Sequence, residues 1–138
     1  MFAAAISACG PVHLRTLLTS LPPYATPILA FYHSRVGHPE TDADLLEEVS
    51  PLNHADRIIR PVLIFQGGTD PRVTREEVEQ IIKAMDHHGI PHEYVLYEDE
   101  GHVLVKEPNR LDFATKALNF LAEHLGGTPA TRPPASQN

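Results

Sequence analysis

The sequence is poor in cysteine, in basic residues and in long apolar runs, and each shortage excludes a class of protein. Cys9 is the one cysteine among 138 residues, so no internal disulfide can form and a cytoplasmic setting is the simplest interpretation. A formal net charge of −7 offers no basic surface for phosphates, so we expect no nucleic-acid partner. No apolar run is long enough to cross a membrane, and no Lys or Arg precedes Arg15, so we expect neither a transmembrane helix nor a secretory signal.

The composition and the periodicity indicate one α/β domain. With 42% hydrophobic and 21% charged residues, the chain can bury a core and keep a polar surface. The run "PVLIFQGG" from Pro61 predicts a strand buried on both faces. The next segment predicts a helix, because Thr74 and Glu77 have capping-box spacing and Gly89 is a helix stop. Its apolar stripe consists of Val78, Ile81, Ile82 and Met85.

The same alternation continues toward the C-terminus. A second strand is predicted over 92–97, and a second helix over 109–125, whose stripe is Leu111, Ala114, Leu118, Leu121 and Leu125. Strand, helix, strand and helix in this order predict a parallel sheet with flanking helices. Residues 127–138 contain three prolines and no periodicity, so we expect a disordered tail after a domain over 1–126.

The first sixty residues predict a third strand and several short helices. The small residues of "FAAAISACG" suit a buried strand, whereas "VHLRTLLTSL", "PILAFYHSRVG" and "TDADLLEEVSPLNHADRI" suggest helical pieces. The outer edge of "FAAAIS" would present unpaired backbone groups. We therefore expect this first strand to pair with something beyond the sheet that the chain itself forms.

Two polar side chains follow the two best-defined strands. Asp70 follows the strand predicted from Pro61, and His102 follows the strand predicted over 92–97. Neighbouring parallel strands lie about 4.8 Å apart, so the two side chains would be close together. Such an Asp can fix the tautomer of a histidine and leave its other nitrogen as a general base. Gly67-Gly68 would allow the sharp turn, and Gly101 would free space beside the histidine. The alternative is that Asp70, which precedes a proline, only forms a turn, and that His102 is one of nine unremarkable histidines.

Three longer stretches resemble a known family. "RPVLIFQGGTDPRV", "EEVEQIIKAMDHHGIPHEYVLYEDEGH" and "NRLDFATKALNFLAEHLG" are similar to the C-terminal part of the prolyl oligopeptidase family catalytic domain, nearest to its acylaminoacyl-peptidase and dipeptidyl-peptidase branches. The likeness extends upstream through "FYHSRVGHPET" and "SPLNHADRI". It implies the C-terminal half of an α/β-hydrolase fold, a peptide substrate in the complete enzyme, and no cofactor or metal. It also implies that Asp70 and His102 belong to a Ser–Asp–His triad.

The sequence departs from that family at the nucleophile. The family's serine stands in a GxSxGG elbow, and no serine here has those flanking glycines; the five are Ser7, Ser20, Ser34, Ser50 and Ser136. The oxyanion hole built around that elbow is missing with it. We therefore expect a C-terminal fragment of a serine peptidase, inactive alone. The alternatives are an interaction module that forms a homodimer through its first strand, and one half of a split enzyme completed by an upstream half-domain.

Other candidate residues have simpler interpretations. Cys9 and Ser7 lie near the end of the strand predicted at the N-terminus, where an attacking thiol is conceivable, but a packed core residue is the favoured interpretation. His87, His88 and His92 lack the spacing of metal ligands and suit a solvated helix end. Phe31 and Tyr32 could line a substrate pocket in the assembled domain, although core packing is favoured.

Overall fold

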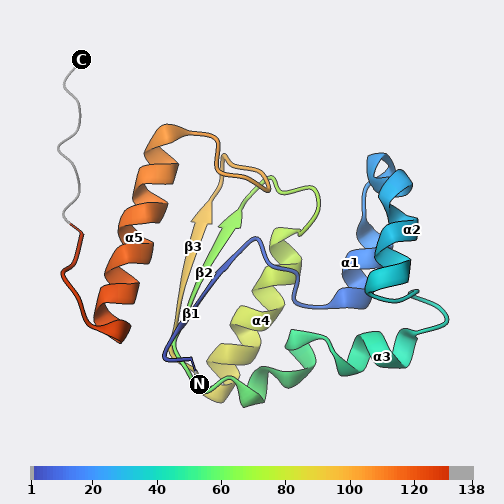
Figure 1. The fold of residues 1–138 in the computed structure, drawn as a ribbon, viewed down its shortest axis with the longest axis horizontal. Helices are drawn as coiled ribbons and strands as arrows, with labels where there is room; N and C mark the ends of the chain where they lie inside the picture. The colour runs from blue at the N-terminus through green and yellow to red at the C-terminus, as the bar shows by residue number, and fades with distance from the viewer. Residues whose placement is uncertain (1, 131–138) are drawn as a thin grey trace.

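The computed structural model describes residues 2–130, which form three strands covered by helices (Figure 1). Residues 1 and 131–138 lie outside the described part, and with them most of the predicted tail. Among the described residues, no helix combines the length and the apolar character needed to cross a bilayer. The elements in chain order are β1 (Ala5–Ala8), α1 (Leu14–Ser20), η1 (Pro23–Ala25), α2 (Thr26–Arg35), α3 (Ala43–Glu48), η2 (Pro51–Arg57), β2 (Val62–Gly67), α4 (Arg75–His88), β3 (His92–Tyr97) and α5 (Glu107–Leu125).

The sheet is parallel and its strand order is β1-β2-β3, which confirms the predicted architecture. In register, Ala5 lies opposite Val62, and Val62 lies opposite His92. All three strands therefore end at one edge of the sheet, and the polar residues that follow them are brought together there. Within residues 2–130, β1 pairs with β2 along one side only, so its other side is one of the two free edges of the sheet, and the outer side of β3 is the other.

Helix α4 covers one face of the sheet as its sequence predicts. Val78, Ile81 and Met85 are buried against Ile64 of β2, in a core that also contains Val12. At the start of the helix, the Thr74 side chain accepts a hydrogen bond from the Glu77 N–H, which is one half of a capping box.

The other half of that capping box does not form, because the Glu77 side chain is used elsewhere. It is 3% exposed, and its Oε1 accepts hydrogen bonds from the N–H groups of Val12 and His13, at 3.2 and 3.3 Å. Glu77 therefore ties α4 to the segment that follows β1. The two backbone N–H groups of this loop replace the Thr74 N–H as donors to the Glu77 carboxylate.

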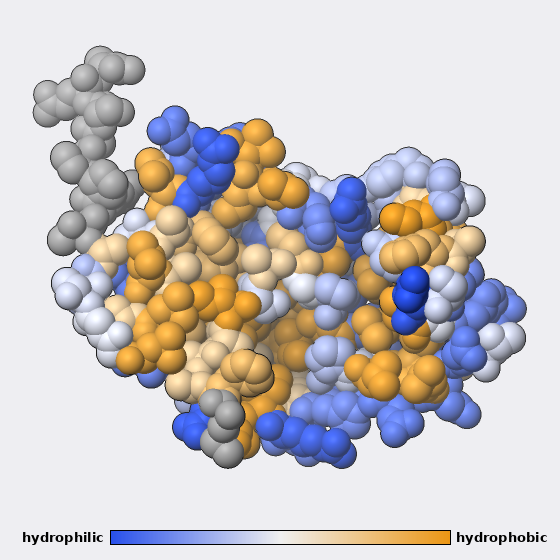
Figure 2. All heavy atoms as spheres, viewed as in Figure 1, coloured by the Kyte–Doolittle hydropathy of each residue, from blue (hydrophilic) through white to orange (hydrophobic). Residues whose placement is uncertain are grey.

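Helix α5 covers the opposite face, but not with the predicted stripe. Phe120 is buried, and the ring of Phe113 packs at a tilt against that of Phe65 of β2, with ring centroids 4.2 Å apart. Most of the predicted stripe points outward, with Leu111, Leu118 and Leu125 48%, 54% and 62% exposed, whereas Leu121 is half-buried. The predicted stripe is therefore not the face that packs on the sheet, because the two phenylalanines form a competing stripe that contacts the aromatic residue in β2. Figure 2 shows the resulting apolar surface over α5.

The segment between β1 and β2 forms the expected short helices. Helices α1 and α3 are held together by Ser50, which is fully buried. Its hydroxyl accepts a hydrogen bond from the Leu14 N–H at 2.9 Å and donates one to the Leu46 carbonyl at 2.5 Å. This subdomain lies beside α4 and away from α5 (Figure 1).

Candidate active site at the carboxyl edge of the sheet

Asp70 lies in the turn that follows β2, and its side chain is completely buried. One carboxylate oxygen, Oδ1, accepts hydrogen bonds from the N–H groups of Arg72 and Val73, at 2.8 and 3.1 Å. The turn-forming interpretation of Asp70 is therefore correct as far as Oδ1 is concerned. The second oxygen, Oδ2, is left for another partner.

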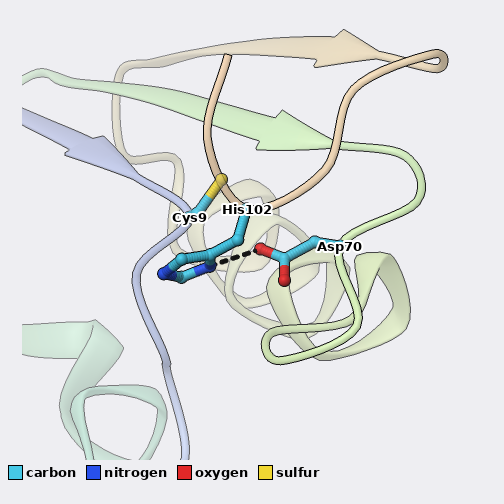
Figure 3. A group of neighbouring side chains, drawn as sticks. All are labelled: Cys9, Asp70 and His102. Carbon is cyan, nitrogen blue, oxygen red and sulfur yellow. Dashed lines mark hydrogen bonds and ion pairs between the residues drawn. The ribbon is translucent and has the colours of Figure 1, made fainter. Parts of the chain in front are cut away.

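That partner is His102, in the loop between β3 and α5. Its Nδ1 lies 2.8 Å from Asp70 Oδ2 (Figure 3). Because a carboxylate can only accept, Nδ1 carries the proton and donates it, which leaves Nε2 of the neutral ring as a lone-pair acceptor. The imidazole is 34% exposed, so Nε2 can reach a group outside this chain's own core. The structure thus brings together the two predicted site residues in the arrangement of a histidine base and its orienting carboxylate.

The loops that carry the two residues touch through their backbones. A Cβ at Gly67 would lie 2.0 Å from the Gly101 carbonyl oxygen, a distance that no side chain can occupy. Thr69 donates its N–H and its hydroxyl to the Glu100 carbonyl, at 2.9 and 2.8 Å. A Cβ at Gly101 would meet nothing within 4 Å apart from the adjacent residues. The glycines that the close approach of the two loops requires are Gly67 and Gly68, since a Cβ at Gly68 would lie 2.7 Å from the Glu98 Cα.

Glu100 fixes the conformation of the loop that carries His102, and the sequence does not predict this role. The residue is 2% exposed. Its carboxylate accepts hydrogen bonds from the N–H groups of Val105 and Lys106, both at 2.9 Å, and from the Asn109 side chain at 2.8 Å. The Val105 N–H lowers the pKa of the Glu100 carboxyl most, and burial opposes it. Glu100 stands two positions before His102, but no sequence pattern indicates that its carboxylate binds the backbone N–H groups of Val105 and Lys106.

We expect the contribution of Glu100 to stability to disappear in acid. Since its pKa is lowered below the ordinary value of 4.5 in the fold, the unfolded chain takes up a proton first as the pH falls. The stabilisation is present above about pH 4.5 and is lost as the pH falls through the lowered pKa. Urea unfolding of wild type and Glu100→Gln should therefore differ near neutrality and converge in acid. Glu98→Gln, on the same turn but 72% exposed, is the control, and a gap independent of pH would contradict the assignment.

Cys9 is the third polar side chain at this edge. It has a positive φ of 49°, a conformation that residues other than glycine rarely adopt, and its N–H bonds to the Phe65 carbonyl at 2.9 Å. The thiol lies beside Asp70 and His102 (Figure 3), so Cys9 is a partly buried residue at the carboxyl edge of the sheet and not a member of the apolar clusters. Burial raises the pKa of the thiol, a backbone hydrogen bond with Gly67 opposes this, and the Asp70 charge raises it further. A thiol held in its protonated form is a poor nucleophile.

A hollow lies next to the Asp70 turn. Its lining includes Tyr24, Ile28, Tyr32 and Arg72, and its volume is about 250 Å³. Tyr32 thus lines a surface hollow and belongs to neither hydrophobic cluster of the described residues.

The remaining histidines considered as metal ligands do not converge. His92 is held by the Ile90 carbonyl, at 2.9 Å from Nδ1, while His87 and His88 contact each other edge-on at the end of α4. The predicted helix end is correct for His87 and His88, whereas His92 is the first residue of β3 and its side chain is only 13% exposed.

The comparisons with known proteins agree with this geometry. The sequence profile of the prolyl oligopeptidase family matches residues 1–128. Dipeptidyl aminopeptidase BIII of Pseudoxanthomonas mexicana is 44% identical over 128 residues, which cover 91% of this chain and 19% of the relative. Dipeptidyl peptidase family member 6 of Caenorhabditis elegans is 34% identical over 140 residues, covering 99% of this chain and again 19% of the relative.

Solved structures show the same likeness. A puromycin-hydrolyzing peptidase of Mycobacterium tuberculosis superposes with a TM-score of 0.85 at 28% identity, over 94% of this chain and 19% of that one. For an acylaminoacyl peptidase of Pyrococcus horikoshii the TM-score is 0.77 at 17% identity, over 94% of this chain and 21% of that one, which supports the fold. The chain spans about a fifth of the length of these proteins, and its strands and helices are part of an α/β-hydrolase fold. From the matching profile, the relatives and the superposed structures together, we conclude that the chain belongs to the prolyl oligopeptidase family of peptidases.

Proposed function

We propose that this chain supplies the base and the orienting carboxylate of a serine peptidase whose nucleophile lies on a different segment. The observation that carries the proposal is the 2.8 Å contact between His102 Nδ1 and Asp70 Oδ2, which leaves Nε2 free and accessible. No serine of the sequence stands in a GxSxG elbow, so the attacking hydroxyl has to come from elsewhere.

In the assembled site, the serine hydroxyl attacks a peptide carbonyl while His102 Nε2 takes its proton. The imidazolium formed in this step is stabilised by the buried Asp70 carboxylate, whose Oδ1 is held by two backbone donors while Oδ2 faces the ring. His102 then gives the proton to the leaving amine. A water repeats the sequence on the acyl-enzyme and releases the acid.

The free edge of β1 is where we propose that the serine-bearing segment pairs. Beside this edge, an apolar hollow of about 610 Å³ is lined by residues that include Phe2, Ile6, Ile59 and Val62. Phe2 and Ile59 are 86% and 73% exposed, so the hollow is an apolar surface that needs a cover. A strand added in parallel to β1 would end at the same edge as Cys9, Asp70 and His102, which is where a nucleophile has to stand.

The test is complementation with the rest of a relative. The chain is mixed with the upstream part of the 44% identical dipeptidyl aminopeptidase, and the mixture is treated with a fluorophosphonate probe. We expect the serine of the upstream part to be labelled in the mixture only, and this chain alone to be unlabelled and to hydrolyse no peptide or ester. An unlabelled serine in a folded complex would end the proposal, as would turnover by the chain alone that is lost in Cys9→Ala.

The same free edge favours one alternative, a catalytically inactive module that pairs with a second copy of itself. This function predicts a dimer whose population rises with protein concentration in sedimentation experiments. The dimer should also prevent the serine-bearing segment from binding to β1. A dimer that the upstream segment displaces would instead support complementation.

A further inference from the structure

A cluster of three metal-binding side chains lies at the carboxyl edge of the sheet. One ligand atom from each of Cys9, Asp70 and His102 lies within 4.8 Å of the others. A tetrahedral zinc site has Zn–S near 2.3 Å and Zn–N or Zn–O near 2.0 Å, so its ligand atoms are about 3.3–3.6 Å apart. Small rotations of these three side chains would therefore suffice to close the cluster around an ion.

The three residues are also held in place by the fold. The Asp70 side chain is fully buried, and its Oδ1 is fixed by two backbone donors while Oδ2 faces the cluster. Cys9 is kept at the cluster by its unusual φ and by the hydrogen bond to Phe65. A strained backbone at a site of polar groups is a common mark of a functional position.

The chemistry of the donor set selects the ion. Thiolate, imidazole and carboxylate are together the ligands of zinc and its close relatives, whereas calcium and magnesium prefer oxygen atoms alone. Three protein ligands leave a fourth position of a tetrahedral ion for water or an added group. The cost of removing the Cys9 proton is offset by the metal–thiolate bond, as in other zinc sites.

We propose that Cys9, Asp70 and His102 form a binding site for a borderline-soft divalent cation such as Zn²⁺. The ion takes the place of the proton between His102 Nδ1 and Asp70 Oδ2, so the metal-bound form and the general-base form of His102 exclude each other. The second ring nitrogen, Nε2, points away from Asp70 (Figure 3), and thus does not share an ion with that carboxylate. The site is a property of this chain and does not depend on the proposed peptidase function.

The probe is Co²⁺, which gives a near-ultraviolet charge-transfer band when a thiolate binds it. Because the sequence has one cysteine, such a band can come from Cys9 alone, whatever the other eight histidines bind. We expect the full chain to develop the band with one equivalent of Co²⁺ and to lose it when Zn²⁺ is added. Zn²⁺ should also raise the Tm of wild type and not that of Cys9→Ser.

The variants decide whether the cluster is the site. His102→Gln and Asp70→Asn should each weaken Co²⁺ binding, measured through the band, by more than about tenfold. His88→Gln and His124→Gln, which change histidines in or near the last turns of α4 and α5, are matched controls and should leave it unchanged. Circular dichroism checks that each variant is folded. No band in the folded wild type, or undiminished affinity in both folded cluster variants, would overturn the proposal.

Discussion

Gly67→Ala is expected to destabilise the chain by at least about 3 kcal/mol, a large part of the 5–15 kcal/mol that holds a typical domain together. The added methyl carbon would lie 2.0 Å from the Gly101 carbonyl oxygen and 2.8 Å from that of Glu100. Both atoms belong to backbone, so no side-chain rotation relieves the overlap. The loop that carries His102 has to move away from the loop that carries Asp70.

Gly101→Ala is the matched control for this experiment. A Cβ at Gly101 meets nothing within 4 Å, so the substitution should change the free energy of unfolding by about 0.5–1 kcal/mol at most. Urea unfolding followed by circular dichroism measures both variants. If Gly67→Ala cost no more than Gly101→Ala, the two loops would not be in contact and the site geometry would be wrong.

The largest expected effect on activity is that of the site residues in the assembled peptidase. Asp70→Asn should lower kcat/KM by about 10⁴-fold, because an amide can present a donor to Nδ1 and stabilise the wrong tautomer of His102. Its carbonyl oxygen can still accept the Arg72 and Val73 N–H groups, so the turn is preserved. His102→Ala should cost about 10⁶-fold, since it removes the base itself.

This pair of variants separates chemistry from folding. His124→Ala, at the end of α5, should retain full activity and is the control for histidine loss. Each variant is assayed in complex with the serine-bearing segment, after sedimentation has shown that the complex forms. An Asp70→Asn complex that kept a tenth of wild-type activity would rule out the orienting role of Asp70.

Asp70 and His102 could be predicted as a pair because a parallel sheet leaves little choice. Once two apolar runs and the helix between them are recognised, the residues after each run have to meet at one edge. The same reasoning predicts that Cys9 lies at the end of β1, but it does not predict the positive φ of Cys9. The hydrogen bond to Phe65 holds that conformation, and its partner is 56 positions away in the sequence.

The parts that could not be predicted depend on choices between equivalent patterns. In α5, Leu111, Leu118 and Leu125 repeat every seven residues, and so do Phe113 and Phe120. Periodicity alone does not show which of the two stripes faces the sheet. The contact between Phe113 and Phe65 of β2 determines it. Glu77 matched a capping box, yet the backbone donors of a distant loop bound its carboxylate instead. In both cases the deciding partner is remote in the sequence.

The register of the sheet has a consequence for the order in which the chain folds. β2 and β3 pair across one helix, with Val62 opposite His92, whereas β1 and β2, with Ala5 opposite Val62, pair across a longer stretch of chain. Closing the shorter loop costs less entropy, so when the complete chain refolds we expect β2, α4 and β3 to associate first and β1 to dock onto them. The Cys9–Asp70–His102 cluster would then be complete only when β1 has joined the sheet.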